Sequence, residues 1–445
     1  MKITIIGGGS YQWTFGFVRQ FVQSKKLVGT TICLIDINRE ALDCVTQASR
    51  LYNERHGTPL VIEATQDLDR ALADAQFVLV AISTGDFEAM RHDLKIPEKY
   101  RIWQTVGDTV GPAGWARAAR NLPVFQDLAR RMQRLCPDAW MLNFTNPLTV
   151  LTRVPTREFG IKAIGMCPGV EMQARSMAKL AGAPLDARLD YVVTGIDHGS
   201  WFTRMNANGV DILSRLKELG YYRSDDQLPS DAVTKDPLAE SARNRAVFAL
   251  WRETGYLPST GDRHHVENHP WFIANETGKL PFAIKRTTIE ERQGWRAKQR
   301  ERLERYLTHQ DESQYGHGDD PVCEVVESLC GYKSFLYGAN FRNIGQIAGA
   351  PVDAVVETRC LFDSAGVHPL CSPLPESLKI MVLPHIYRQE AMIEVVLRGN
   401  FDEFVALVIT DPLCSRLSIG DCRQMMKELL LANRAFITNP RLLEF

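Results

Sequence analysis

The sequence lacks the features that place a chain in a membrane or outside the cell. It contains no apolar run near the roughly 20 residues that a helix needs to span a bilayer. Met1 leads directly into a β-branched run, without the charged and apolar segments of a secretory signal. The 10 cysteines follow no framework spacing and form no Cys-x-x-Cys pair, which is typical of reduced thiols. We therefore expect a cytoplasmic protein without a membrane partner.

An excess of charge of either sign is also missing. The 445 residues contain 52 Lys and Arg against 53 Asp and Glu, a formal net charge of -1. This balance offers no broad positive surface for nucleic acid or for an acidic membrane. Internal repeats and low-complexity tracts are absent, and the hydrophobic fraction of 45% is ordinary for a globular enzyme. We expect a small-molecule substrate.

The first 190 residues alternate short apolar runs with helix-length amphipathic segments. This alternation, with strands that are apolar on both faces, predicts an α/β fold with a Rossmann-like, doubly wound parallel sheet. Residues 191–445 are less regular, and we expect them to form a mixed α+β domain for substrate binding and subunit contacts. The expected strands of the first part are Lys2–Ile6, Thr31–Ile35, Phe77–Ile82 and Trp140–Asn143, with helices such as Arg39–Glu54 and Ala116–Leu135 between them.

In the second part the pattern predicts a strand over Tyr191–Gly195 and a long charged helix over Glu290–Tyr306. Further helices are expected over Asp236–Glu253 and Gln389–Arg398. The polar, Gly-containing stretch Asp311–Pro321 is predicted to be a mobile loop.

A glycine-rich turn follows the first expected strand, where Rossmann-like folds seat a dinucleotide. Gly7 and Gly9 occupy the first two glycine positions of such a turn, and Ser10 follows them. These residues let the backbone approach a pyrophosphate at the N-terminus of the next helix. Asp36 ends the second strand, where a carboxylate binds ribose hydroxyls and disfavours a 2′-phosphate, so we expect NAD. The alternative is an ordinary tight connection, because Gln12 replaces the third glycine.

Two other strand ends carry polar residues that belong to the same expected edge. Ser83 follows the Phe77–Ile82 strand, and Asn146 follows the Trp140–Asn143 strand. In open parallel sheets ligands bind at the carboxyl ends of the strands. We therefore expect both residues to contact the cofactor and Asn146 also to contact the substrate, although a loop cap before Pro147 would explain Asn146 as well.

Cys167 and His198 end two apolar, strand-like runs about thirty residues apart. A thiolate and an imidazole form a soft donor pair that suits a transition metal. Two protein ligands would leave positions open for substrate hydroxyls or water. Taken alone, either residue is more often a core or hydrogen-bonded side chain than a ligand.

Two loops could contribute polar groups to a site. The glycine-rich loop over residues 107–114 contains one acid, Asp108, and is otherwise typical of a flexible connection. The cluster over residues 261–268 contains Arg263, His264 and His265, which could receive an anionic substrate group, or could be a solvated loop.

With these motifs in order, the sequence resembles glycoside hydrolase family 4, the NAD- and metal-dependent α- and 6-phospho-glycosidases. The resemblance runs nearly from end to end and implies a glycosidase with NAD, a divalent metal such as Mn²⁺, and a homodimeric or homotetrameric assembly. The residues that carry it are Gly7–Ser10, Leu34–Asp36, Gln104–Asp108, Asn146-Pro147, Gly165–Cys167, Gly195–His198, Asn343–Ile347 and Val355–Glu357.

The resemblance also implies a mechanism and roles for individual residues. NAD⁺ takes hydride from sugar C3, a base removes the proton on C2, the C1 substituent leaves, water adds at C1, and the hydride returns to C3. Cys167 and His198 match the metal ligands, and the metal polarises the C2 and C3 oxygens. Asp262 corresponds to the C2 base, with Tyr256 as the alternative, and Asp108 to the acid that assists the leaving group.

Two departures from the family pattern bear on the substrate. Pro168 follows the cysteine where the family has a polar residue, and Asp197 precedes the histidine where it has Asn. A related NAD-dependent group hydrolyses sulfoquinovosides, and with the basic loop these departures favour an anionic sugar, a sulfoquinovoside or a uronide. The alternatives are an NAD-dependent dehydrogenase of a polyol or hydroxy acid that forms net NADH, and a non-catalytic NAD-sensing or sugar-binding protein.

Overall fold

The computed structural model describes residues 1–57, 59–223, 243–312 and 321–445. Its centre is one mixed sheet, whose parallel part has the strand order β3-β2-β1-β4-β5-β6. This is the strand order of a Rossmann-type sheet, in which a ligand crosses the carboxyl ends of the strands where the order reverses, between β1 and β4. The parallel strands are β1 Lys2–Ile6, β2 Thr31–Ile35, β3 Val61–Thr65, β4 Phe77–Val80, β5 Trp140–Asn143 and β6 Lys162–Gly165.

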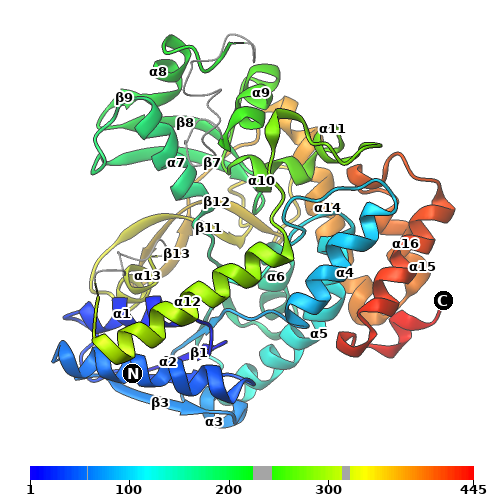
Figure 1. The fold of residues 1–445 in the computed structure, drawn as a ribbon. Coiled ribbons are helices and arrows are strands. Elements are labelled where there is room, and N and C mark those ends of the chain that lie inside the picture. The colour runs from blue at the N-terminus through cyan, green and yellow to red at the C-terminus, as the bar shows by residue number, and fades with distance from the viewer. Residues whose placement is uncertain (58, 224–242, 313–320) are drawn as a thin grey trace.

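Helices cover both faces of the parallel part, which is why its strands are apolar along nearly their whole length (Figure 1). All four residues of β4 are buried. The helices that connect these strands are α1 Thr14–Gln23, α2 Arg39–Arg55, α3 Leu68–Leu72, α4 Asp86–Glu98, α5 Gly111–Leu135 and α6 Leu148–Phe159, followed after β6 by α7 Gly169–Leu180. The predicted α/β, Rossmann-like class is confirmed.

The sheet does not stop near residue 190 but continues with antiparallel strands. Gly165 of β6 pairs with Asn340 of β11, and Glu357 of β12 pairs with Gly195 of β7. The antiparallel strands are β7 Leu189–Gly195, β8 Trp201–Ala207, β9 Val210–Asp211, β10 Leu257–Pro258, β11 Phe335–Arg342, β12 Val355–Asp363 and β13 Gly366–Pro369. Segments far apart in the sequence thereby share one hydrogen-bonded layer.

The remaining helices pack around this layer (Figure 1). The C-terminal helices α14 to α16 form a large apolar cluster with α5 and α6. The charged helix α12 lies across α2 and α4. Their bounds are α8 Ile212–Glu218, α9 Arg245–Thr254, α10 Asp262–His265, α11 Pro270–Ile273, α12 Ile289–His309, α13 Val322–Leu329, α14 Glu376–Arg398, α15 Phe401–Val408 and α16 Ile419–Ala432.

Most expected elements of the second part are present with shifted ends. The expected strand over Tyr191–Gly195 is β7, and the charged helix over Glu290–Tyr306 is α12. Of the helix expected over Asp236–Glu253, residues 236–242 lie outside the described residues, and the described part is α-helical from Arg245 onward, as α9. The loop expected over Asp311–Pro321 lies mostly outside the described residues. The expected Gln389–Arg398 helix is the second half of α14.

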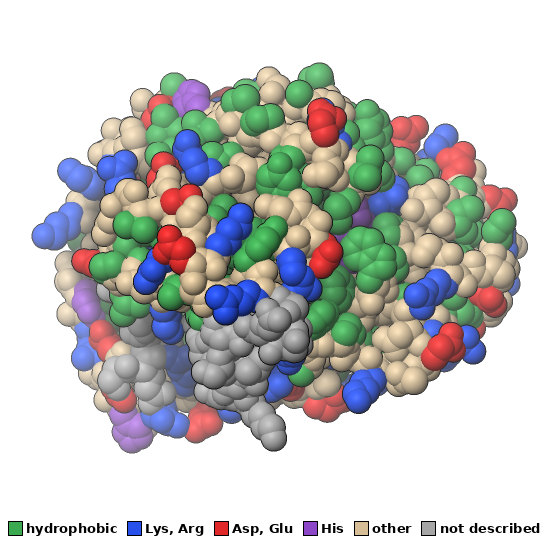
Figure 2. All heavy atoms as spheres, turned by 90° about the horizontal axis from the view of Figure 1, so that it is seen from above, with side chains coloured by type: hydrophobic (Ala, Val, Ile, Leu, Met, Phe, Trp, Pro, Cys, Tyr) green, Lys and Arg blue, Asp and Glu red, His purple; other side chains and the backbone are tan. Residues whose placement is uncertain are grey.

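Seen from above, the surface interleaves positive, negative and apolar side chains, in agreement with the balanced composition (Figure 2). Among the described helices, none is long and apolar enough to cross a bilayer.

The turn after β1 depends on Gly7. Gly7 has a φ of +93°, and a Cβ at this position would overlap the backbone carbonyl of Ala81. We expect Gly7→Ala to lower the free energy of unfolding by more than about 2 kcal/mol, because left-handed strain adds to the overlap. Gly16→Ala is the matched control: it lies inside α1 with open space around it, so it should stabilise by roughly 0.5–1 kcal/mol. Urea unfolding of both variants measures the difference, and equal effects would contradict it.

Candidate active site

Hydrogen bonds attach the turn between β1 and α1 to the end of β2. The backbone N–H groups of Gly7 and Gly8 both donate to the carbonyl of Ile35, at 3.0 and 2.8 Å. The Asp36 carboxylate accepts hydrogen bonds from Gly9 N and Asn38 N, each at 2.9 Å. Asp36 is therefore held at the strand end beside the glycine turn, where a ribose hydroxyl could reach it.

The other predicted cofactor contacts lie along the same edge, because β1, β4 and β5 are parallel. The Ser10 hydroxyl accepts from Trp13 N at 3.3 Å and lies at the entrance to α1. The Ser83 hydroxyl is buried and has no hydrogen-bond partner within the described residues, so it can serve a ligand. The Asn146 side chain accepts from Leu148 N at 3.1 Å, which leaves its amide NH₂ available.

Cys167 and His198, predicted as metal ligands, meet in the structure. The Cys167 Sγ lies 3.5 Å from His198 Nε2 and accepts a hydrogen bond from Gly169 N at 3.4 Å. Asp197 joins them, because one ligand atom from each of Cys167, Asp197 and His198 lies within 4.8 Å of the others. A sulfur, a nitrogen and an oxygen at this spacing can share one transition-metal or Mn²⁺ ion.

The orientation of His198 is set by its neighbours. Its φ is 60°, in the left-handed region, and Asn268 Nδ2 donates to its carbonyl at 2.9 Å. The Thr109 hydroxyl lies 2.8 Å from His198 Nδ1 and donates to the Asp108 carboxylate at 3.1 Å. The hydroxyl therefore accepts from Nδ1–H, and Nε2 faces the Cys167 sulfur. Thr109 thus acts as the residue that orients the imidazole.

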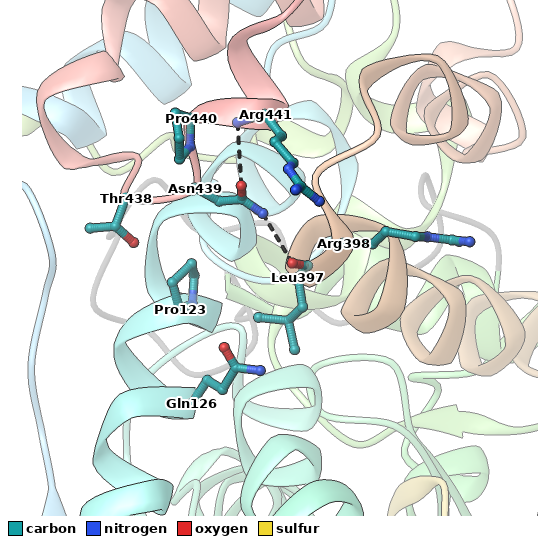
Figure 3. Close-up of a pocket in the computed structure, with 8 residues that line it drawn as sticks. All are labelled: Pro123, Gln126, Leu397, Arg398, Thr438, Asn439, Pro440 and Arg441. Carbon is teal, nitrogen blue, oxygen red and sulfur yellow. Dashed lines mark hydrogen bonds between the residues drawn. The ribbon is translucent and has the colours of Figure 1, made fainter.

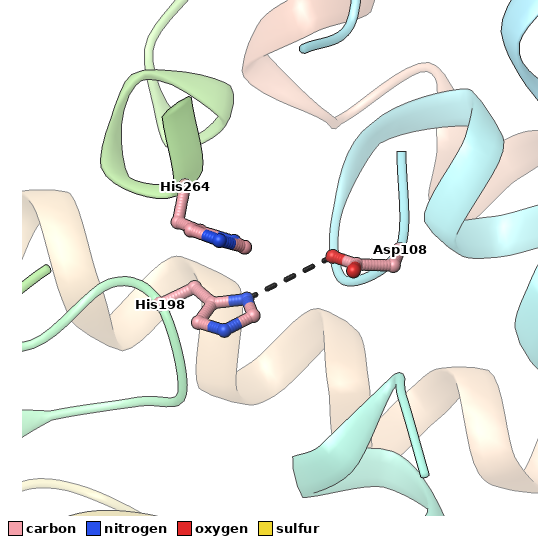
Figure 4. Close-up of side chains that lie close together, drawn as sticks. All are labelled: Asp108, His198 and His264. Carbon is pink, nitrogen blue, oxygen red and sulfur yellow. Dashed lines mark ion pairs between the residues drawn. The ribbon is translucent and has the colours of Figure 1, made fainter. Parts of the chain in front are cut away.

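Asp108 lies on the other side of the same imidazole, with His264 above it (Figure 4). Its carboxylate is 3.8 Å from His198 Nδ1, and the rings of His198 and His264 have centroids 4.2 Å apart. Burial alone would raise the pKa of Asp108, but His198 and the nearby arginines lower it to about 2. Burial lowers the pKa of His264 to about 3, so its imidazole is neutral.

Asp262, predicted as the C2 base, is the first residue of α10, and its buried carboxylate lies against the N-terminus of α9. Its carboxylate accepts from Val247 N at 2.9 Å and also from the N–H groups of Ala246 and Arg245. Burial raises the pKa of Asp262 to about 7 in spite of these hydrogen bonds. The carboxylate therefore caps a helix and is also able to exchange a proton near neutral pH. Tyr256, the alternative base, is half-buried at the edge of the large apolar cluster.

The basic residues of the 261–268 cluster do not form one positively charged group. Arg263 is half-buried, and its Nη1 donates to Thr287 Oγ1 at 3.1 Å. His265 is fully buried, with its ring edge against Trp201 at 4.6 Å between centroids. Burial lowers the pKa of His265 well below its usual range, so this ring forms part of the wall and carries no charge for an anion.

Several residues that contact or act on the Asp108 loop were not predicted from the sequence. Glu267 accepts from the backbone N–H groups of Val106 and Gly107, at 2.7 and 2.9 Å, and so fixes the loop that carries Asp108. Arg117 and Arg292 both act electrostatically on Asp108, although they lie on α5 and α12. Nothing distinguishes these arginines in sequence, because both helices contain many others.

The described surface also has a shallow hollow between α5, the end of α14 and the chain terminus, lined in part by Gln126, Arg398 and Arg441 (Figure 3). None of its lining residues belongs to the loops that carry Cys167, His198 or Asp108.

Known families match the chain over most of its length. Residues 2–183 match the model for the family 4 glycosyl hydrolases, and residues 193–414 match that for the family 4 glycosyl hydrolase C-terminal domain. The chain belongs to glycosyl hydrolase family 4. The predicted family and the prediction of a glycoside hydrolase are thereby confirmed.

Relatives and solved structures agree with this assignment. The chain is 30% identical to the alpha-galacturonidases of Thermoanaerobacterium saccharolyticum, over 98% of this chain and 96% of the relative, and of Bacillus subtilis, over 97% of each. It superposes on the Bacillus subtilis glucosidase lplD with a TM-score of 0.83, at 28% identity over 97% of this chain and 99% of that chain. A 6-phospho-alpha-glucosidase from gut microorganisms, crystallised with NAD and Mn²⁺, has a TM-score of 0.80 at 19% identity and 98% coverage of both chains.

Glu267 should make the stability of the protein depend on pH. Burial raises the pKa of Glu267 to about 7, so the folded state keeps a proton that the unfolded chain loses near pH 4.5. This contribution is complete below about pH 4.5 and is lost as the pH rises through 7. Glu267→Gln retains an acceptor for Val106 and Gly107 but cannot titrate.

We expect the variant to lose less stability than the unmodified protein between pH 5 and 8, by on the order of 1–3 kcal/mol. Thermal unfolding at both pH values measures this. The control is Glu276→Gln, at an exposed ion pair with Arg101. Identical pH profiles for the unmodified protein and Glu267→Gln would contradict the assignment.

Proposed function

We propose that the protein is an NAD- and divalent-metal-dependent glycosidase that hydrolyses the α-glycosides of an anionic sugar, with a hexuronide as the favoured substrate. The observation that carries the proposal is the meeting of Cys167 and His198 at the same sheet edge as the Gly7 turn and Asp36. Relatives named alpha-galacturonidase support the uronide.

The proposed NAD site follows from the parallel strands. The turn Gly7–Ser10 would receive the pyrophosphate, and Asp36 the adenosine ribose. Ser83 and Asn146 would contact the part of the cofactor that lies across β4 and β5. When bound, NAD supplies a hydride acceptor for sugar C3 and returns the hydride after the glycosidic bond has broken.

The proposed metal site fits a divalent ion on two grounds. The separation of 3.5 Å between Cys167 Sγ and His198 Nε2 is what two ligands of one ion require. Both carboxylate oxygens of the adjacent Asp197 are buried without an N–H or O–H donor among the described residues. A bound divalent ion supplies polarisation of the C2 and C3 oxygens of the sugar.

We assign the removal of the C2 proton to Asp262, with Tyr256 as the alternative. A carboxylate with a pKa of about 7 accepts a proton at neutral pH and gives it up again, as a general base must. The pKa of about 2 favours the ionised form of Asp108, which suits it poorly to the leaving-group acid that the resemblance implied. Instead, we propose that Asp108 orients His198 through Thr109 and accepts a hydrogen bond from the substrate or from water.

In this proposal, arginine side chains bind the anionic group of the substrate. Arg263 keeps its predicted role, and Arg117 and Arg292 join it because both act on Asp108. His264 and His265 are uncharged and could contribute only neutral N–H groups. Arginine forms bidentate hydrogen bonds with a carboxylate, which suits a hexuronide.

In this proposal residues 1–190 provide the cofactor edge. Residues 191–445 provide most of the substrate wall and the contacts of a homodimer or homotetramer.

The proposed reaction predicts glycoside cleavage without net oxidation. Aryl α-galacturonide, incubated with the protein, NAD⁺ and Mn²⁺, should release its aglycone while the absorbance of NADH stays flat. The matched α-galactoside should react at least about tenfold more slowly, because one lost charged hydrogen bond costs roughly 1.5–3 kcal/mol. The 6-phosphate and the 6-sulfonate keep a negative charge but lack the planar carboxylate that pairs with arginine, so we expect them also to react more slowly than the uronide. Stoichiometric NADH with an intact glycosidic bond would show a dehydrogenase instead.

Asp262→Asn separates proton abstraction from helix capping. Asn retains an oxygen that can accept from Val247 N, so α9 and NAD binding should persist. If Asp262 is the base, exchange of the C2 hydrogen with D₂O should fall by about 10²–10⁴-fold, together with aglycone release. Proton NMR of the substrate follows the exchange. Undiminished exchange would exclude Asp262, and Tyr256→Phe would then be the variant to measure.

A further inference from the structure

We infer that Asp197 is a third protein ligand of the divalent ion, beside Cys167 and His198. The inference rests on the metal dependence in the proposed function and adds a donor that the two-ligand prediction did not contain. Three observations support it: the Asp197 carboxylate lies close to Cys167 and His198, it has no N–H or O–H donor in the part of the chain that the structure describes, and its negative charge would help to neutralise a divalent ion.

The chain brings Asp197 and His198 into the same space directly after β7. Gly195 ends the strand, and the left-handed backbone of His198, with φ of 60°, turns the chain sharply after it. The Asp197 Oδ2 lies 3.6 Å from His198 Nδ1. A carboxylate oxygen, the Cys167 sulfur and an imidazole nitrogen lie within 4.8 Å of one another, which is the span of ligands around one ion.

Apart from the Cys167 side chain, the Asp197 carboxylate lacks the hydrogen-bond partners that a buried charge needs. The residue has 0% exposure, and neither oxygen has an N–H or O–H donor among the described residues. The nearby imidazole of His198 already uses its Nδ1 with Thr109 at 2.8 Å. Asp93, which is equally buried, shows the ordinary solution, because it forms a bidentate pair with Arg120, with Oδ1 2.9 Å from Nη1. A buried, unpaired carboxylate is costly, and a bound cation would satisfy it.

A second buried acid increases the need for a cation. Asp197 acts on Glu357 as a like charge. The oxygens of Glu357 are engaged, because Asn340 Nδ2 donates to it at 3.0 Å and the Ser200 hydroxyl donates to it as well. Glu357 is therefore held as a neighbour of the site and is not free to be a ligand, whereas Asp197 is.

The third ligand changes the charge of the site. A thiolate from Cys167 and a carboxylate from Asp197 together neutralise a divalent ion, while the imidazole of His198 adds no charge. Affinity for a cation rises with the number of charged ligands. We expect the ion to be retained before a sugar binds, with substrate oxygens completing its coordination afterwards.

The test measures Mn²⁺ binding to the unmodified 445-residue protein in the presence of NAD⁺ and without sugar, and the EPR signal of free Mn²⁺ reports the unbound fraction. Asp197→Asn should weaken binding by at least about 10- to 100-fold, since even the loss of a group that only supports a ligand costs this much. The control is Asp190→Asn, an exposed residue of the same strand that pairs with Arg359 at 2.7 Å and should leave Mn²⁺ affinity unchanged.

Equal Mn²⁺ affinity of Asp197→Asn and the unmodified protein would overturn the inference and leave the proposed glycosidase intact. Failure of the unmodified protein to bind Mn²⁺ would overturn both this inference and the metal part of the proposed function. If Asp197→Asn does not fold, crystals of the unmodified protein soaked in Mn²⁺ provide the test, because an anomalous difference map locates the ion relative to Asp197. An oxygen of Asp197 about 2.0–2.2 Å from the ion supports ligation, and a separation beyond about 3 Å excludes it.

Discussion

Two backbone pairings hold the candidate site together: Gly165 with Asn340, and Gly195 with Glu357. They insert β11 and β12 between the last parallel strand and β7, so the loops after β6 and β7 face one another across the sheet edge. A Cβ on Gly165 would press on Thr152 and Asn340, at 2.8 and 2.9 Å, so close packing at this junction requires glycine. Without this junction the thiolate and the imidazole would belong to separate layers.

The site contains several buried acids, and their neighbours decide which of them are ionised. Asp108 faces cationic groups, and its pKa falls to about 2 in spite of burial. Burial dominates at Asp262 and Glu267, where backbone N–H groups are the main partners and each pKa rises to about 7. One fold therefore provides both a permanently charged carboxylate and carboxylates that can exchange a proton at neutral pH.

The basic side chains near the site also differ in charge: the histidines of the 261–268 cluster are neutral and the arginines are charged. Burial removes the charge from His264 and His265 but leaves arginines charged, because the guanidinium pKa stays high: even buried Arg117 keeps a pKa of about 10. Recognition of an anionic sugar therefore moves, in our proposal, from the histidine pair to Arg117, Arg263 and Arg292. The histidines serve instead as neutral rings, with His264 beside His198 and His265 against Trp201.

The sequence by itself determined the parallel sheet, the glycine turn with Asp36, the family, and the pairing of Cys167 with His198, because local periodicity and ordered motifs carry this information. Only the tertiary structure decided which acids and bases surround them. Thr109, Asp197, Glu267, Arg117 and Arg292 come from five separate segments, and their roles depend on burial and on partners up to hundreds of positions away. The ionisation of buried acids and the surroundings of the proposed ligand pair are properties of a three-dimensional environment, which no local pattern of residues encodes.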